Sequence, residues 1–361
     1  MSVLNDNFKA FPLEPMLALL PSIADDPDVM TSTPNIQRAA DACWVCGNIA
    51  GNRLVFAKEQ MFGTGQRFTY LHCGGCGVLH LLHVPMDMSR YYPRESYYSV
   101  HSRARALRGA IKRWRDRAHA GPSPLGRWLA AYAPNIALDA MLRALPNRQA
   151  RVLDVGCGDG QLLSSMARVG YSQLTGIDPL IGSTRTIDGV RLQCGELASV
   201  EGVFDLISFH HSLEHIVGQV EVLTHARQLL APGGRLLIRV PTCESFAFEV
   251  YGADWVQLDA PRHIFLHSHR SIARVAEDAG LRVERLYCDS QPMQFWGSDM
   301  YRDGVPLMSG QIPRYKRRNA GLYKRMSTWL NAHLRGDQIV LTLVNGLAAP
   351  GSALPSPGGQ F

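Results

Sequence analysis

From residue 151 onward, short β-branched apolar runs alternate with stretches of helical periodicity. This alternation is typical of a sheet built mainly of parallel strands, with helices on both faces. Seven runs are expected to form strands, at residues 151–155, 174–178, 190–194, 204–209, 235–240, 282–288 and 338–344. The pattern therefore predicts an α/β fold with a doubly wound, seven-stranded sheet.

The remaining parts of the chain differ in composition. The first 40 residues are rich in Pro, Asp, Ser and Thr, and a basic helix predicted at 103–120 is broken by Gly-Pro-Ser-Pro at 121–124. The expected units are a loosely ordered leader at 1–41, a small module at 42–98 that closes with Tyr91, Tyr92, Tyr97 and Tyr98, a helical linker at 99–150, the α/β domain at 151–344 with an insertion at 289–337, and a flexible tail at 345–361.

The first predicted strand of the α/β domain runs into the sequence VLDVGCGDG at 152–160. Gly156, Gly158 and Gly160 predict a tight turn that lets the backbone approach a ligand before a helix begins. Dinucleotide enzymes use G-x-G-x-x-G at this place, whereas the spacing here is G-x-G-x-G. Asp154 adds negative charge beside the turn, which disfavours a phosphate and favours a cationic, zwitterionic ligand.

Acidic residues follow the next two predicted strands. Asp178 lies about 20 residues beyond the glycine turn, where a carboxylate can accept hydrogen bonds from both hydroxyls of a ribose. Glu196 follows the third strand, and the fourth ends in FHHSLEH at 209–215. Because the carboxyl ends of parallel strands meet at one edge of a sheet, these groups are expected to line one crevice.

Over residues 151–344 the order of these features resembles the class I S-adenosylmethionine (SAM)-dependent methyltransferases. The resemblance implies a Rossmann-like domain that binds SAM and transfers its methyl group. The cofactor-binding residues that it implies are Asp154, Gly156, Cys157, Gly158, Gly160, Asp178, Pro179, Glu196 and His210. A nucleotide-binding α/β domain with another cofactor remains an alternative.

The chain departs from the common form of this family in two places. The gap between Asp178 and the strand at 190–194 leaves room for only a short helix. The insertion at 289–337 stands where a tight hairpin is usual, and we expect it to cover the acceptor site.

Four of the eight cysteines form two pairs, CWVCG at 43–47 and CGGCG at 73–77. In each C-x₂-C-G knuckle two thiolates can converge on one ion, and the glycine relieves crowding. The spacing predicts a closed, structural Zn²⁺ site, with free thiols or a redox pair as alternatives. Its expected ligands are Cys43, Cys46, Cys73 and Cys76.

A zinc module before such a domain is similar to a group of bacterial sugar, polysaccharide and secondary-metabolite methyltransferases. The segments FHHSLEH and WVQLDAPRH, at 209–215 and 255–263, are similar to that group as well. The resemblance implies a small-molecule acceptor.

Composition and charge add only limits. No run approaches the roughly 20 apolar residues of a membrane helix, and no basic-then-apolar signal segment opens the chain, so we expect a cytoplasmic protein without membrane insertion. The net charge of +6 permits acidic partners without requiring them. The oligomeric state is not predicted.

Three histidines are expected near the acceptor. Transfer to a hydroxyl needs a base, and histidine titrates near neutral pH. His263 is the first candidate because it follows Pro261 in a turn expected to form a lid, with Arg262 beside it to bind an anionic group of the acceptor. The other candidates, His211 and His215, are alternatives to it.

The histidines also have structural interpretations. Each of the three can instead cap a loop or pack beside the cofactor, and Arg262 can instead form an ion pair. His211, Glu214 and His215 share one face if a helix starts there. They could then hold a divalent metal, as in small-RNA 3′-end methyltransferases with a similar phrase.

Three functions follow from these features. The first is methyl transfer to a small molecule, such as a sugar, a nucleotide-linked sugar or a natural-product intermediate. The second is an RNA methyltransferase that binds RNA through the zinc module and the basic residues at 103–117. The third is a non-catalytic SAM-binding partner protein.

Overall fold

The computed structural model describes residues 42–92, 116, 135–145 and 147–346. The expected leader, most of the basic helix at 103–120, Tyr97, Tyr98 and the tail after residue 346 lie outside these residues. No helix within the described ranges is long and apolar enough to cross a membrane.

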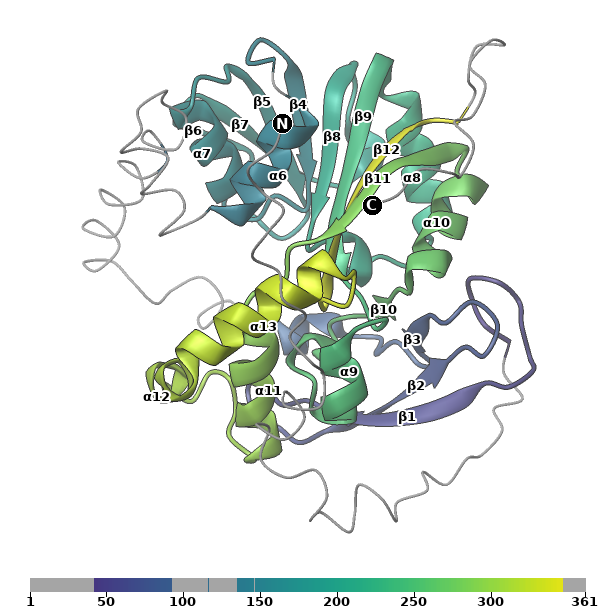
Figure 1. Ribbon diagram of the computed structural model, residues 1–361. Helices are drawn as coiled ribbons and strands as arrows, with labels where there is room; N and C mark the ends of the chain where they lie inside the picture. The colour runs from purple at the N-terminus through teal and green to yellow at the C-terminus, as the bar shows by residue number, and fades with distance from the viewer. Residues whose placement is uncertain (1–41, 93–115, 117–134, 146, 347–361) are drawn as a thin grey trace, which may run out of the picture.

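A mixed eight-stranded sheet forms the larger layer (Figure 1), with strand order β11-β12-β9-β8-β4-β5-β7-β6. Strands β9, β8, β4, β5 and β7 are parallel, whereas β11 and β12 run antiparallel at one edge. The seven expected strands are confirmed as β4 (Arg151–Val155), β5 (Gln173–Asp178), β7 (Val190–Cys194), β8 (Phe204–His210), β9 (Leu230–Pro241), β11 (Leu281–Cys288) and β12 (Gln338–Asn345).

The eighth strand, β6 (Arg185–Ile187), corrects the expectation of a short helix before β7. It pairs antiparallel with β7, and Ile187 lies opposite Val190. The two residues between them, Asp188 and Gly189, have φ angles of 52° and 78°. An Asp-Gly pair with two positive φ angles is the preferred two-residue hairpin turn, so the chain reverses here instead of coiling.

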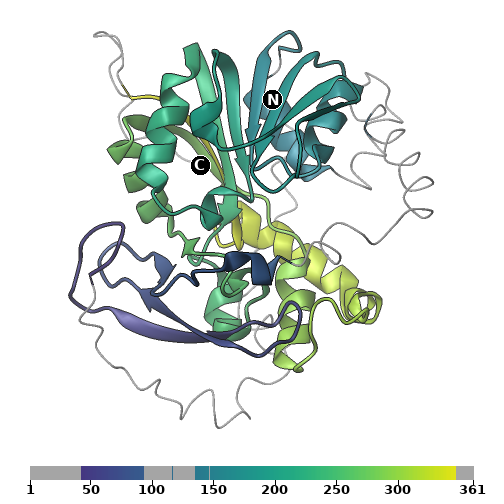
Figure 2. The ribbon, with the colours of Figure 1, turned by 180° about the vertical axis from the view of Figure 1, so that it is seen from behind.

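Helices cover both faces of the large sheet (Figures 1 and 2). Adjacent strand residues point to opposite faces: Val152 packs with the core under α6 (Ile136–Ala144) and α7 (Gln161–Arg168). Leu153 packs with the core under α8 (Gln219–Gln228) and α10 (His269–Asp278). Both faces are therefore buried, as the near-continuous apolar strands predict.

A smaller sheet contains β1 (Arg53–Lys58), β2 (Arg67–His72), β3 (Leu79–Leu81) and β10 (Phe265–Leu266), in that order. Strand β10 comes from the α/β domain and pairs with β3 through Phe265 and His80. The N-terminal module therefore receives its fourth strand from a segment far along the chain.

The insertion packs beside this smaller sheet and shares its core (Figure 1). It holds α11 (Met293–Arg302), α12 (Ile312–Arg318) and α13 (Ala320–Ala332), next to α9 (Phe246–Tyr251). Tyr70 of β2, Trp255 and Phe295 of α11 are fully buried in the shared core. Single 3₁₀ turns lie at Met88–Tyr91, Leu197–Ser199, Leu213–His215, Gly252–Asp254 and Val256–Leu258.

Candidate active site

A cavity of about 720 Å³ opens at the carboxyl edge of β4, β5, β7 and β8. Its volume suits a small-molecule ligand. The structure brings these sequence-predicted residues to its wall: Gly156, Gly158, Asp178, Pro179, Glu196, His211 and His215. No residue of the insertion at 289–337 lines the cavity, so within the described chain the expected cover over the site is not seen there.

The glycine turn and Asp178 are locked together. The backbone N–H of Gly158 donates to Oδ2 of Asp178 at 2.9 Å, and the N–H of Leu180 donates to Oδ1 at 2.7 Å. Gly156 has a φ of 76°, and a Cβ there would lie 2.4 Å from Cβ of Ser212. Only glycine fits at residue 156. The two backbone amides hold the carboxylate of Asp178 in a fixed orientation at the cavity wall.

Four other residues predicted to bind the cofactor do not line the cavity: Asp154, Cys157, Gly160 and His210. Asp154 lies beneath the turn and accepts a hydrogen bond from Ser208 Oγ at 2.7 Å, while burial raises the pKa of its carboxyl group to about 7. Burial also lowers the pKa of His210, and neither ring nitrogen of His210 has a hydrogen-bond partner among the described residues.

A histidine–carboxylate cluster, comprising His211, Glu214, His215 and His263, lies beside the cavity just beyond the end of β8. His211 has a φ of 51°, which is uncommon for a residue other than glycine and occurs frequently at functional sites. Glu214 is fully buried, and Nδ1 of His211 lies 3.3 Å from its Oε1. The rings of His215 and His263 lie 4.9 Å apart.

Only His211 and His215 of this cluster line the cavity; His263 lies behind His215. Its Nδ1 lies 2.7 Å from the carbonyl oxygen of Gln257, and burial lowers its pKa to about 4. Nδ1 of His215 lies 2.7 Å from the carbonyl oxygen of Arg262.

The sequence comparisons agree with this geometry. A family model described as a methyltransferase domain matches residues 129–286. A ubiquinone biosynthesis O-methyltransferase of Xanthomonas oryzae pv. oryzae (strain PXO99A) is 32% identical over 173 residues, which are 42% of this chain and 71% of the relative. The enzyme of the same name from Xylella fastidiosa (strain 9a5c) is 32% identical over 169 residues, 41% of this chain and 68% of the relative.

This chain belongs to the SAM-dependent methyltransferases. Among solved structures, a mycolic acid cyclopropane synthase complexed with SAH and CTAB aligns with a TM-score of 0.39 and 17% identity, over 60% of this chain and 84% of that one. The mitomycin 7-O-methyltransferase aligns with a TM-score of 0.39 and 14% identity, over 71% of this chain and 70% of that one.

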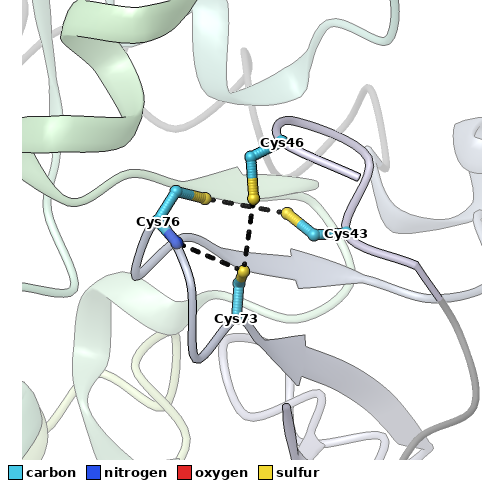
Figure 3. Close-up of side chains that lie close together, drawn as sticks. All are labelled: Cys43, Cys46, Cys73 and Cys76. Atoms are coloured by element: carbon cyan, nitrogen blue, oxygen red, sulfur yellow. Dashed lines mark hydrogen bonds between the residues drawn. The ribbon is translucent and has the colours of Figure 1, made fainter. Parts of the chain in front are cut away.

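The zinc module of this methyltransferase brings its four cysteines together (Figure 3). Sγ of Cys43 lies 3.7 Å from Sγ of Cys76, and Sγ of Cys46 lies 3.6 Å from Sγ of Cys73. Four sulfurs bound to Zn²⁺ at about 2.3 Å lie about 3.8 Å apart, so these distances match a tetrahedral site. The backbone N–H of Cys76 donates to Sγ of Cys73 at 3.3 Å, as suits a thiolate.

Arg262 does not bind an acceptor. It is fully buried, and its Nη2 lies 2.9 Å from Oε1 of Glu59 and 2.6 Å from Oδ1 of Asp259. The methyltransferase therefore uses Arg262 as an ion-pair bridge between the zinc module and the α/β domain. The lid expected at the turn of residues 261–263 is likewise wrong, because all three residues are buried. Trp255, earlier in the same segment, is fully buried as well and donates through Nε1 to Oδ2 of Asp337 at 3.1 Å.

Tyr92 also lines the cavity, although the sequence does not predict it as a site residue. It belongs to the tyrosine run at the end of the zinc module, and its hydroxyl lies 3.2 Å from Nδ1 of His215. The aromatic run itself was a visible signal. The contact of Tyr92 with His215 could not be predicted from the sequence, because 123 residues separate them.

Proposed function

We propose that this methyltransferase transfers the methyl group of SAM to a hydroxyl oxygen of a small molecule. The observation that carries the proposal is that His211 and His215 line the same cavity as the glycine turn and the acidic strand end, with the buried Glu214 against His211. Relatives that are 32% identical are named O-methyltransferases, which supports oxygen as the acceptor atom.

In this account SAM lies along the carboxyl edge of the sheet. Asp178 accepts hydrogen bonds from the ribose hydroxyls, because its carboxylate is held at the cavity wall by two backbone amides. Glu196 lies at the same wall, beyond β7, and suits the adenine edge. The part of the cavity lined by Tyr92, His211 and His215 is left for the acceptor.

Methyl transfer from a sulfonium is an in-line displacement, so the protein must mainly align the two reactants and accept a proton. The bond between sulfur and methyl carbon breaks, the bond between carbon and acceptor oxygen forms, and the sulfonium becomes a neutral thioether. The hydroxyl proton must leave. We assign its removal to His215 in place of His263, because His215 reaches the cavity and His263 lies behind it.

The hydrogen bond to Arg262 prepares His215 for this role. Nδ1–H of His215 donates to the carbonyl oxygen of Arg262 at 2.7 Å, which leaves the lone pair on Nε2. Since Arg262 is fixed by the buried carboxylate of Glu59 and the partly buried carboxylate of Asp259, the ring has a firm support.

We also propose that Zn²⁺ occupies the Cys43, Cys46, Cys73 and Cys76 site. Four thiolates close the coordination sphere, so the ion supports the fold and takes no part in methyl transfer. Through β3 and β10 the module stabilises the segment that carries Arg262 and His263.

The acceptor class can be tested directly with methyl-labelled SAM. The purified protein is incubated with cell-extract fractions that contain small metabolites, RNA or protein, and a His215→Gln variant serves as the control. We expect label in the small-molecule fraction, in an alkali-stable ether, and far less with the variant. Label confined to RNA would replace this proposal with the RNA methyltransferase.

A further inference from the structure

Glu214 is a buried carboxylate without adequate partners. Its side chain is fully inaccessible, and neither oxygen has an aligned hydrogen-bond donor among the described residues. The nearest donor, Nδ1 of His211, stands 3.3 Å from Oε1. A buried charge with so little compensation is strongly unfavourable unless a cation or a proton joins it.

The two histidines beside Glu214 each keep a lone pair on Nε2. Nδ1–H of His263 donates to the carbonyl oxygen of Gln257 at 2.7 Å, so Nε2 carries the lone pair, and it lies 3.9 Å from Oε1 of Glu214. His215 is held in the same way by the carbonyl oxygen of Arg262. Metal-binding histidines commonly donate their other N–H to a backbone carbonyl, which fixes the ring and its tautomer.

One ligand atom from each of Glu214, His215 and His263 lies within 4.8 Å of the other two. An ion bound at about 2.0–2.2 Å holds its ligand atoms about 3–4 Å apart, so small side-chain rotations are enough to close the site. From these positions we infer that Glu214, His215 and His263 form a second metal site, which binds one divalent transition-metal ion. It differs from the set predicted from sequence spacing, because His263 replaces His211 as a ligand.

His211 is not a ligand of this site, because its Nε2 accepts a hydrogen bond from Arg239. Nη1 of Arg239 donates to its Nε2 at 2.8 Å, and Arg239 is itself held by Asp289 at 2.7 Å. The remaining proton of His211 is therefore on Nδ1 and faces Glu214, where it orients the carboxylate. His211 is a positioning residue for this site.

The donor set indicates the type of ion and its use. Two imidazoles and one carboxylate suit Zn²⁺, Fe²⁺, Co²⁺ or Mn²⁺ and leave positions open. His215 lines the cavity, so an open position can face it. Resting on the proposed function, His215 has two alternative roles: in the metal-free protein its Nε2 accepts the proton, whereas with the ion bound it is a ligand. An acceptor hydroxyl coordinated to the ion then loses its proton more readily, and water accepts that proton.

Co²⁺ titration of protein that carries one equivalent of zinc per chain tests the site, since the four thiolates take the first equivalent and leave the second site open. We expect one Co²⁺ per chain, with weak visible d–d absorption and no thiolate charge-transfer band. Glu214→Gln and His263→Gln should each weaken Co²⁺ binding by at least about tenfold. His269→Gln should not, because that histidine lies 3.7 Å from Glu244, outside the cluster.

SAM affinity measured in the same samples reports whether each variant has folded. Absence of Co²⁺ binding in wild-type protein that binds SAM, or equal Co²⁺ affinity in Glu214→Gln, His263→Gln and His269→Gln, overturns the metal site. Neither result bears on the proposed small-molecule acceptor. That proposal is contradicted only if methyl-labelled SAM labels RNA or protein instead of a small molecule.

Discussion

The hydroxyl of Tyr92 lies 3.2 Å from Nδ1 of His215, and both side chains line the same cavity. Tyr92 ends the part of the zinc module that the structure describes, whereas His215 follows β8 of the large sheet. The N-terminal module therefore contributes a wall of the cavity. Together with β10 and Arg262, this contact makes the module part of the site.

The role of His215 can be separated from SAM binding. We expect His215→Gln to lower turnover of a hydroxyl acceptor by roughly 10²–10⁴-fold, because proton removal is impaired, while SAM affinity barely changes. Steady-state kinetics and calorimetry measure the two effects. His225→Gln is the matched control, since His225 lines the same cavity from α8, outside the cluster. Near-normal turnover in His215→Gln would assign that residue to structure.

The four-cysteine site should hold one zinc ion. A Cys43→Ser, Cys73→Ser double variant is expected to lose one zinc per chain relative to wild type, because two of four tetrahedral ligands are gone. Metal analysis by mass spectrometry counts the loss. The exposed Cys194 provides the control: Cys194→Ser should keep its zinc. Full zinc retention in the double variant would contradict the assignment.

Arg262 should matter for stability. Arg262→Met leaves the buried Glu59 and the partly buried Asp259 without their cation, so we expect a loss of about 3–5 kcal/mol in the free energy of unfolding. Arg151→Met is the comparison, because it breaks an exposed pair with Asp205 and should cost less than about 1 kcal/mol. Urea unfolding measures both, and equal losses would argue against the ion-pair bridge.

Local sequence patterns predicted the parts of this protein that depend on neighbours in the chain. The seven strands follow from apolar runs, and the position of Asp178 at the cavity wall follows from parallel strands ending at one edge. The cysteine pairs converge because each knuckle presets two ligands. The exception is the hairpin at Asp188 and Gly189: the Asp-Gly signal is local, but the expectation of a short helix there came from the family resemblance.

The features that could not be predicted from the sequence depend on contacts between residues far apart in the chain. Arg262 was expected to bind the acceptor, yet its partner Glu59 lies 203 residues away in the chain. Which of His215 and His263 lines the cavity depends likewise on how the segment at 255–263 packs against the zinc module. Spacing alone fixes neither.

Asp154 should give stability a particular pH dependence. Burial raises the pKa of its carboxyl group from 3.8 to about 7, so between these pH values the folded protein keeps a proton that the unfolded chain releases. The free energy of unfolding should therefore fall as the pH rises from about 4 to 7 and level off above. Asp154→Asn should lose this part of the slope.

Urea unfolding of wild type and Asp154→Asn at several pH values tests this. Asp205→Asn is the control of opposite sign, since Arg151 lowers the pKa of Asp205 and its contribution is lost in acid. Parallel pH profiles for wild type and Asp154→Asn would show that Asp154 ionises normally in the folded protein.

SAM is expected to lie against Asp178 at the carboxyl edge of β5. Calorimetric titration of SAM into wild type, Asp178→Ala and Glu201→Ala tests this directly, because Glu201 is an exposed acidic residue that does not line the cavity. We expect one SAM per chain and a loss of about 1–3 kcal/mol in binding free energy for Asp178→Ala alone, since the ribose loses a charged acceptor. Unchanged affinity in Asp178→Ala would contradict the proposed binding site.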